Sequence, residues 1–128
     1  MHFHWSKMED IINRGGGNLL IRVYNSTPDE ELDKVQDVHV HMDGREVVVP
    51  AGTQVKLHPG ESISIYPYMY HDFEIEEGTG PVLIGEVSQC NDDNTDNRFY
   101  KSVGRFPELE EDEAPYRLLC NEYPEAKR

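Results

Sequence analysis

The sequence predicts an all-β fold, in the form of a closed antiparallel β-barrel of the jelly-roll type. Short apolar runs alternate with Gly, Pro, Asn and Asp at intervals of about eight to twelve residues, the spacing of strands and turns in sandwiches and barrels. In addition, Asp43–Gly44 separates the runs Val38–Met42 and Arg45–Val49. Asp-Gly between two such runs is a strong hairpin signal. Consecutive short strands of this kind favour a closed antiparallel barrel.

The strands follow from the apolar runs between these turns. We expect them, in chain order, at residues 19–24, 38–42, 45–49, 54–57, 61–66, 71–76 and 81–87. Turn residues punctuate these runs, among them Pro59–Gly60 before the fifth run and Pro67 after it. The number and shortness of the runs predict strands and leave no room for a long helix.

The length of 128 residues suits a single domain with its own core. We expect residues 1–88 to form the barrel and residues 89–128 to form a loop and a C-terminal arm. The stretch 91–97 has no apolar residue and is predicted to be a loop. The apolar residues scattered over 98–128 predict an arm that packs across the barrel. We expect the acidic run 108–113 within it to be a solvated face.

Charge and hydropathy exclude two classes of partner. With 25 acidic and 12 basic residues the net charge is −13, which repels nucleic acids and anionic membrane surfaces. No apolar stretch is long enough to span a membrane, and the first residues do not resemble a secretory signal. We therefore expect a cytoplasmic protein without nucleic-acid or membrane partners. In that compartment Cys90 and Cys120 are expected to be free thiols.

A pattern of histidines and one glutamate predicts a metal site. His2 and His4 are two residues apart, so on a strand both side chains lie on one face. Glu9 follows on the next short strand, before a turn at Gly15–Gly17. His71 begins a strand of another hairpin and supplies a fourth ligand. Three imidazoles and a carboxylate suit Mn²⁺, Fe²⁺, Co²⁺, Ni²⁺ or Zn²⁺.

A second H-x-H pair, His39 and His41, competes with the first. Packing Val38 and Val40 inward leaves both of these histidines facing solvent. The pair also lacks a nearby carboxylate followed by a glycine turn. We interpret His39, His41 and His58 as surface residues.

The spacings H-x-H-x4-E and P-G-x6-P-x3-H, with glycines between them, match the two-part signature of the cupin superfamily. Longer segments are more specific: HFHWSKMEDIINRGGGNL, PGESISIYPYMYH, GEVSQCNDDNTDNRFY and GRFPELEEDEAPYRLLCNEYP resemble the D-lyxose isomerase family over essentially the whole chain. The resemblance implies a cupin fold and the metal ligands His2, His4, Glu9 and His71. It also implies a divalent metal, commonly manganese.

The resemblance further implies an aldose–ketose isomerase that interconverts D-lyxose with D-xylulose, and often D-mannose with D-fructose. Family members are considerably longer, with a further region before the H-x-H strand, so this chain resembles their C-terminal portion. Strand edges left exposed in such a short form favour a homodimer.

Isomerisation requires a polarised carbonyl, a base and stabilisation of charge. Lys7 lies between His4 and Glu9, where it can place a charge at the sugar oxygens. Glu86 lies in the apolar run 82–87, so its carboxylate either borders a polar cavity as a general base or faces water at an edge. The likeness of GEVS to the family segment favours the catalytic role.

Other residues complete the list of candidates. Glu108 and Glu111 in the arm are alternative bases. Asp93 in the polar loop and Arg117 in the arm are expected to bind substrate. Two other functions stay open: a non-catalytic cupin module that binds sugar or metal, and another metal-dependent cupin enzyme such as a dioxygenase. The family-like segments argue against the dioxygenase.

Overall fold

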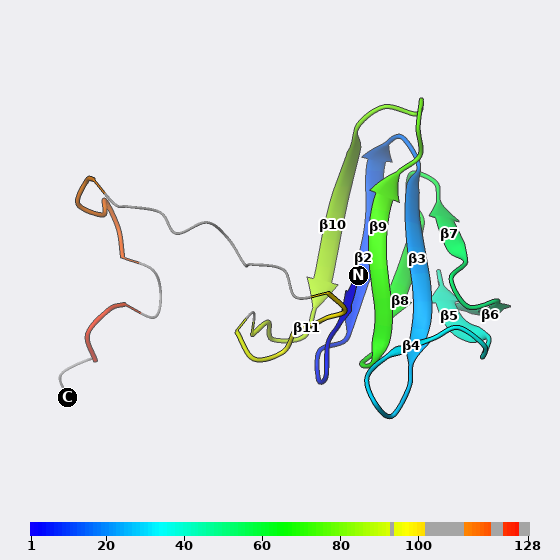
Figure 1. Ribbon diagram of the computed structural model, residues 1–128. Helices are drawn as coiled ribbons and strands as arrows, with labels where there is room; N and C mark the ends of the chain where they lie inside the picture. Colours follow the sequence, from blue (N-terminus) through cyan, green and yellow to red (C-terminus); the bar gives the residue numbers. More distant parts are fainter. Residues whose placement is uncertain (93, 102–111, 119–121, 126–128) are drawn as a thin grey trace.

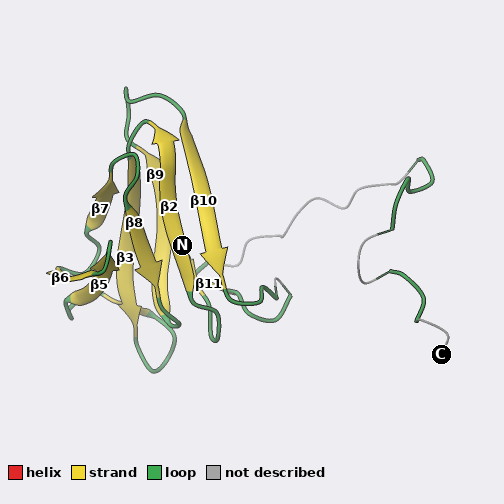
Figure 2. Cartoon of the chain, turned by 180° about the vertical axis from the view of Figure 1, so that it is seen from behind, coloured by secondary structure: helices red, strands yellow, loops and turns green. Residues whose placement is uncertain are grey.

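The computed structural model describes residues 1–92, 94–101, 112–118 and 122–125. In this part of the chain every regular element is a β-strand, and the strands form two antiparallel sheets that face each other (Figures 1 and 2). The predicted all-β class is confirmed. The described residues contain no helix with the length and apolar character needed to cross a membrane.

Each sheet mixes strands from distant parts of the sequence. The first sheet has the order β11 (Arg98–Phe99), β1 (His2–Phe3), β9 (Met69–Ile75), β3 (Leu19–Ser26) and β4 (Leu32–Asp33), with β7 (Gln54–Leu57) also paired to β3. The second has the order β10 (Val82–Ser88), β2 (Glu9–Gly16), β8 (Ser62–Ile65), β5 (Val38–Met42) and β6 (Arg45–Val49). Because each sheet is a separate hydrogen-bonded unit among the described residues, the cupin-like barrel takes the form of a sandwich.

The predicted hairpin around Asp43–Gly44 is confirmed. β5 pairs with β6 in the register Met42↔Arg45, and the two turn residues have φ angles of 47° and 75°. Positive φ at both central positions is the type I′ geometry, whose twist matches that of the flanking strands.

The glycine turn lies later than predicted, and β2 is longer. Gly15 and Gly16 end β2, which runs for eight residues, and the chain turns at Gly17–Asn18. Gly16 has a φ of 95°, and a Cβ there would lie 2.1 Å from the carbonyl oxygen of Pro81. Only glycine fits both constraints, because β10 passes directly beside this position. β9 likewise begins at Met69, two residues before the predicted start.

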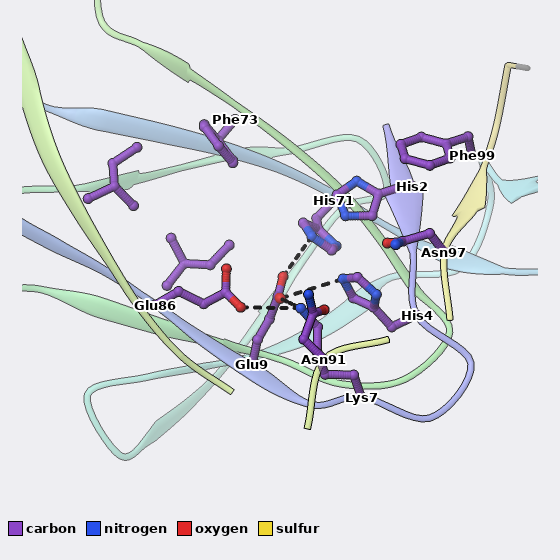
Figure 3. Close-up of a pocket in the computed structure, with 12 residues that line it drawn as sticks. His2, His4, Lys7, Glu9, His71, Phe73, Glu86, Asn91, Asn97 and Phe99 are labelled. Atoms are coloured by element: carbon purple, nitrogen blue, oxygen red, sulfur yellow. Dashed lines mark hydrogen bonds and ion pairs between the residues drawn. The ribbon is translucent and has the colours of Figure 1, made fainter. Parts of the chain in front are cut away.

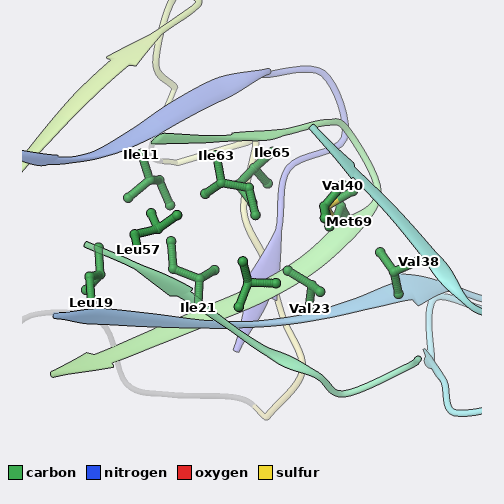
Figure 4. Packing of buried hydrophobic residues seen from close by; sticks show 11 residues of the cluster. Ile11, Leu19, Ile21, Val23, Val38, Val40, Leu57, Ile63, Ile65 and Met69 are labelled. Atoms are coloured by element: carbon green, nitrogen blue, oxygen red, sulfur yellow. The ribbon is translucent and has the colours of Figure 1, made fainter. Parts of the chain in front are cut away.

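The core lies between the two sheets (Figure 4). β3 contributes Leu19, Ile21 and Val23 at alternate positions, all fully buried, and β5 contributes Val38 and Val40. Side chains of this kind each stabilise the fold by about 1.5–3 kcal/mol when fully buried. The core fills one part of the space between the sheets and leaves the end near β1 to polar residues.

The first residues of the predicted arm lie against the barrel, because β11 pairs with β1 and the ring of Tyr100 lies near that of Tyr70, with centroids 5.9 Å apart. Farther along, the arm is described at 112–118 and 122–125, and all of these residues are exposed. The predicted packing of the arm across the barrel is therefore not seen in them. Cys90 is exposed and unpaired, as predicted, whereas Cys120 lies outside the described residues. The division at residue 88 stays a prediction.

Candidate metal centre

A polar pocket lies at the end of the sandwich where β1, β2, β9 and β10 meet the loop before β11 (Figure 3). Its volume is about 320 Å³, at the small end of the range for ligand sites. Six of the predicted site residues line it: His2, His4, Lys7, Glu9, His71 and Glu86. The sequence places these residues up to 84 positions apart, from His2 to Glu86, and the sheets bring them to one cavity.

Strand register brings the three imidazoles together. β1 pairs with β9 in the register His2↔His71, and the centroids of these rings are 4.3 Å apart. His4 follows β1 directly, with its ring centroid 4.9 Å from that of His2. One nitrogen from each ring lies within 4.8 Å of the others. Among the described residues this is the one group of three side chains spaced to share a metal ion.

The other side of β1 is apolar, as the alternation of the strand requires. Phe3 is fully buried, and its ring lies against Tyr70, with centroids 4.8 Å apart. Burial of Phe3 fixes β1 on the first sheet and so directs the histidines at positions 2 and 4 to the pocket.

Hydrogen bonds of His4 and His71 define which ring nitrogens face the pocket. Nδ1 of His4 donates to the main-chain oxygen of Asp96 at 2.7 Å, and Nδ1 of His71 donates to that of Met69 at 3.1 Å. A carbonyl oxygen only accepts, so Nδ1 carries the proton in each ring. In a neutral imidazole Nε2 then presents a lone pair to the pocket, which is the form that binds a metal.

Glu9 faces those two nitrogens. Its carboxylate oxygens lie 2.9 Å from Nε2 of His71 and 3.5 Å from Nε2 of His4, and the second of these nitrogens is buried without a hydrogen-bond partner. A lone pair pointing at a carboxylate is unfavourable unless a proton or another cation lies between them. The donor set of three imidazoles and one carboxylate therefore fits a divalent metal ion.

The pKa values at this site are shifted because the imidazoles and the carboxylate are buried close together. Burial, then the nearby His71 and His4, lower the pKa of His2 to about 3. Burial opposes ionisation of Glu9, but the ring nitrogens of His4 and His71 and the ammonium group of Lys7 beside the carboxylate outweigh it and hold the pKa of Glu9 far below its usual range. For His4 burial also disfavours the charged ring, but Glu9 and the carbonyl oxygen of Asp96 outweigh it and raise the pKa. Metals bind neutral imidazole and ionised carboxylate, so a metal at this site would compete with a proton on His4.

Lys7 is almost fully buried, with 5% of its surface exposed. Its Nζ lies 2.7 Å from a carboxylate oxygen of Glu9 and 3.2 Å from one of Glu86. Burial would lower the pKa of Lys7, but these two carboxylates outweigh it and raise the pKa. Lys7 is therefore a fixed cation, which agrees with its predicted charge at the sugar oxygens and argues against use of a lysine of lowered pKa as the base.

Glu86 lies on β10, the edge strand of the second sheet, and 49% of its side chain is exposed. Both interpretations made from the sequence hold in part, because the residue is at an edge and also lines the pocket beside Lys7. Its carboxylate is accessible to a substrate there.

Of the remaining predicted site residues, only Arg117 is described, and it does not line the pocket. Arg117 is exposed, donates a hydrogen bond to the carbonyl oxygen of Tyr116 at 3.0 Å and lies over its ring. Asp93, Glu108 and Glu111 lie outside the described residues.

Sequence reasoning missed several pocket residues. Asn91, Asn97 and Phe99 line the polar side, and Phe73 contributes to the apolar wall opposite (Figure 3). Asp96 lies behind His4 and Lys7. Nothing in a loop of Asn, Asp and Thr distinguishes these positions, since each residue type there is also typical of a solvated turn.

The second H-x-H pair, His39 and His41, was predicted to face solvent, and this is confirmed for His39 and only in part for His41. His39 is exposed and hydrogen-bonds the Glu46 carboxylate across the hairpin. His41 is half-buried rather than fully exposed, because its ring lies against that of Tyr66, with centroids 5.2 Å apart. His58 is exposed, as predicted.

Comparison with known proteins identifies the family of this chain. The family model for D-lyxose isomerase matches residues 1–123. The chain belongs to the D-lyxose isomerase family. A D-lyxose/D-mannose isomerase from Serratia proteamaculans is 51% identical, and one from Escherichia coli O157:H7 is 49% identical, each over 123 residues that cover 96% of this chain. The matched region is 54% of each relative, so the chain spans about half the length of these members of the D-lyxose isomerase family.

Proposed function

We propose that the protein is a metal-dependent aldose–ketose isomerase that interconverts D-lyxose with D-xylulose, and D-mannose with D-fructose. The two relatives are D-lyxose/D-mannose isomerases, which supports the sugar class. The observation that carries the proposal is the convergence of three imidazoles, a buried carboxylate and a buried ammonium group in one open pocket. This set combines a cation site with groups that can move and stabilise protons.

His2, His4, Glu9 and His71 are the residues that would hold the metal, for which Mn²⁺ is the first choice and Co²⁺, Fe²⁺, Ni²⁺ and Zn²⁺ are alternatives. When bound, the metal would polarise the sugar carbonyl and neutralise charge on its oxygens. The hydrogen bonds of His4 and His71 to main-chain carbonyls orient these rings before any ligand arrives.

Glu86 is the proposed general base. In the aldose-to-ketose direction it takes the proton from C2 and returns it to C1, while a second proton moves from O2 to O1. Its position at the pocket, half exposed, allows contact with a bound sugar. The ammonium group of Lys7 donates a hydrogen bond to Glu86 and holds it in place, and it stabilises negative charge that develops on the sugar oxygens. Asp93 and Arg117 are proposed to bind substrate.

The proposal is tested by incubation of the metal-loaded protein with D-lyxose and measurement of D-xylulose. We expect turnover in the parent and in the matched control His39→Ala, and none in His71→Ala. Absence of ketose from a parent with full metal content would contradict the catalytic proposal.

The second candidate is a non-catalytic module that binds sugar or metal. It is favoured by one observation, namely that the chain spans about half the length of its relatives. Metal binding without turnover in the experiment above would support it. A dioxygenase activity, the third candidate, would instead consume oxygen.

We also propose that the protein acts in the cytoplasm as a homodimer. The exposed edge strand β6, with Val48 53% exposed, supports association of two copies. Analytical ultracentrifugation tests the dimer directly, and a monomer at micromolar concentration would contradict it.

A further inference from the structure

The turn between β1 and β2 carries His4 and Lys7, and Asp96, far along the sequence, makes three of the hydrogen bonds that hold it. The carboxylate of Asp96 accepts hydrogen bonds from the main-chain N–H groups of Ser6 and Lys7, both at 2.9 Å. Its main-chain oxygen accepts from Nδ1 of His4 at 2.7 Å. Only 8% of Asp96 is exposed, so these bonds are made away from bulk water.

Asp96 is itself fixed on both sides. Its N–H donates to the carbonyl oxygen of Asp92 at 2.9 Å, which closes a turn. Two residues later β11 begins, and it pairs with β1 in the register Phe3↔Arg98. The loop before β11 therefore holds Asp96 at one place relative to the metal-binding turn.

We propose that Asp96 is a positioning residue for the site. Its carbonyl oxygen selects the His4 tautomer that presents Nε2 to the metal, and its carboxylate fixes the main chain of Lys7 so that the ammonium group reaches Glu9 and Glu86. The expected effect on metal affinity rests on the proposed metal-dependent function. The expected tautomer of His4 and the hydrogen bonds of the turn can be tested without metal.

His71 shows why His4 in particular depends on this loop. Nδ1 of His71 donates to Met69, two residues away on its own strand, so β9 alone sets that tautomer. Nδ1 of His4 has its acceptor 92 residues away. A disturbance of the loop at Asp96 should therefore affect His4 and leave His71 unchanged, which makes His71 an internal control.

The chain also offers an external control. Asp33 accepts hydrogen bonds from two main-chain N–H groups, those of Val35 and Gln36, at 2.8 and 3.0 Å. This carboxylate has the same kind of partners as Asp96, but it lies at the end of the short strand β4 and does not line the pocket.

The first measurement is the Mn²⁺ dissociation constant of the full 128-residue chain. Asp96→Ala keeps the carbonyl oxygen that faces His4 but removes the carboxylate that anchors the turn and thereby sets where that ring lies. We expect it to weaken binding by about 10-fold, the lower end of the usual cost of disturbing the support of a metal ligand. Asp33→Ala should bind as the parent does. Parental affinity in a folded Asp96→Ala variant would overturn the proposed effect on the metal site.

The second measurement needs neither metal nor turnover. In the metal-free parent, at an alkaline pH where the rings are neutral, ¹⁵N NMR should show the Nδ1–H tautomer for both His4 and His71. Asp96→Ala should change the signals of His4 alone, and the amide protons of Ser6 and Lys7 should exchange faster. An Nε2–H tautomer of His4 in the parent, or unchanged exchange in the variant, would overturn the inference.

Two safeguards keep the outcomes separate. If Asp96→Ala does not fold, Asp96→Asn replaces it, because asparagine keeps the volume and one acceptor oxygen while it loses the second. If the parent binds no Mn²⁺, the proposed function fails, and the tautomer and exchange data still decide the role of Asp96.

Discussion

Two H-x-H pairs occur in this protein, and they differ in what faces them. His2 and His4 lie beside β9, where His71, Glu9 and a buried lysine complete a polar pocket. His39 and His41 lie on the outward side of β5, where their cross-strand neighbours are Val48 and Glu46.

The same three-residue pattern therefore has two outcomes. On β5 the apolar residues Val38 and Val40 are drawn into the core, which directs the histidines outward. On β1 the faces are reversed: the pairing of His2 with His71, and of His71 with the core residue Val23, places the histidines on the side that faces the second sheet. Phe3 is buried on the opposite side of β1, against Tyr70. Whether H-x-H is a metal site depends on the strand opposite, which the pattern itself does not contain.

Removal of the metal from the first pair should have the largest effect on isomerase activity. Exhaustive treatment with EDTA should abolish isomerase activity, because the polarising cation is lost, and Mn²⁺ or Co²⁺ should restore it. Ketose formation from D-lyxose is the measurement. Full activity in chelated protein of verified low metal content would contradict the metal mechanism.

Removal of one histidine from each group should separate the two pairs. His71→Ala deletes an imidazole that faces Glu9, so metal occupancy should fall more than the 10–100-fold typical of losing an outer partner. His41→Ala should leave occupancy near that of the parent. Metal analysis of both purified variants decides this, and equal losses would mean that the wrong pair has been assigned.

Replacement of the catalytic candidates should affect turnover and spare the metal. Glu86→Gln keeps the shape of the side chain and removes the base, so kcat should fall by about 10²–10⁴-fold with a smaller change in KM. Lys7→Met should lower kcat in the same way. Steady-state kinetics at saturating D-lyxose, on variants of checked metal content, provides the test. If Glu86→Gln has the kcat of the parent, Glu86 is not the base and has only a structural role.

The metal-free protein should lose stability in acid because of His2, whereas the raised pKa of His4 acts in the opposite direction. The pKa of His2 falls from 6.5 to about 3 on folding, so below pH 6.5 the unfolded chain binds a proton that the folded chain does not. This contribution to the free energy of unfolding decreases as the pH falls from 6.5 toward 3. The lowered pKa of Glu9 acts in the same direction, starting below its unfolded value of about 4.5.

Urea unfolding between pH 7 and pH 4 measures this effect, with His2→Gln as the variant. The variant should show a shallower decrease in stability over that range, because glutamine does not titrate. Identical pH profiles for parent and variant would show that His2 is as accessible to protons in the folded protein as in the unfolded chain.

The smallest effect is expected at His39. Its ion pair with Glu46 is on the surface, where such pairs contribute about 0–1 kcal/mol. His39→Ala should change neither metal content nor activity, and thermal unfolding should shift only slightly. A large loss of metal in this variant would remove the distinction between the two pairs.

Much of this protein was predictable from its sequence. The spacing of apolar runs and turns predicted the β fold, and Asp43–Gly44 predicted the hairpin, because both depend on local backbone preferences. The spacing of His2, His4, Glu9 and His71, with the family resemblance, also predicted the residues that the structure brings together in the pocket.

Tertiary structure alone decided the rest. The register His2↔His71, the charged state of Lys7 and the bonds from Asp96 to the turn join residues that are far apart in the chain. Local preferences carry no information about such contacts, since a buried lysine or aspartate looks like a solvated one until its partners are in place. Electrostatic interactions depend on distance and burial, and both are set only when the two sheets have packed.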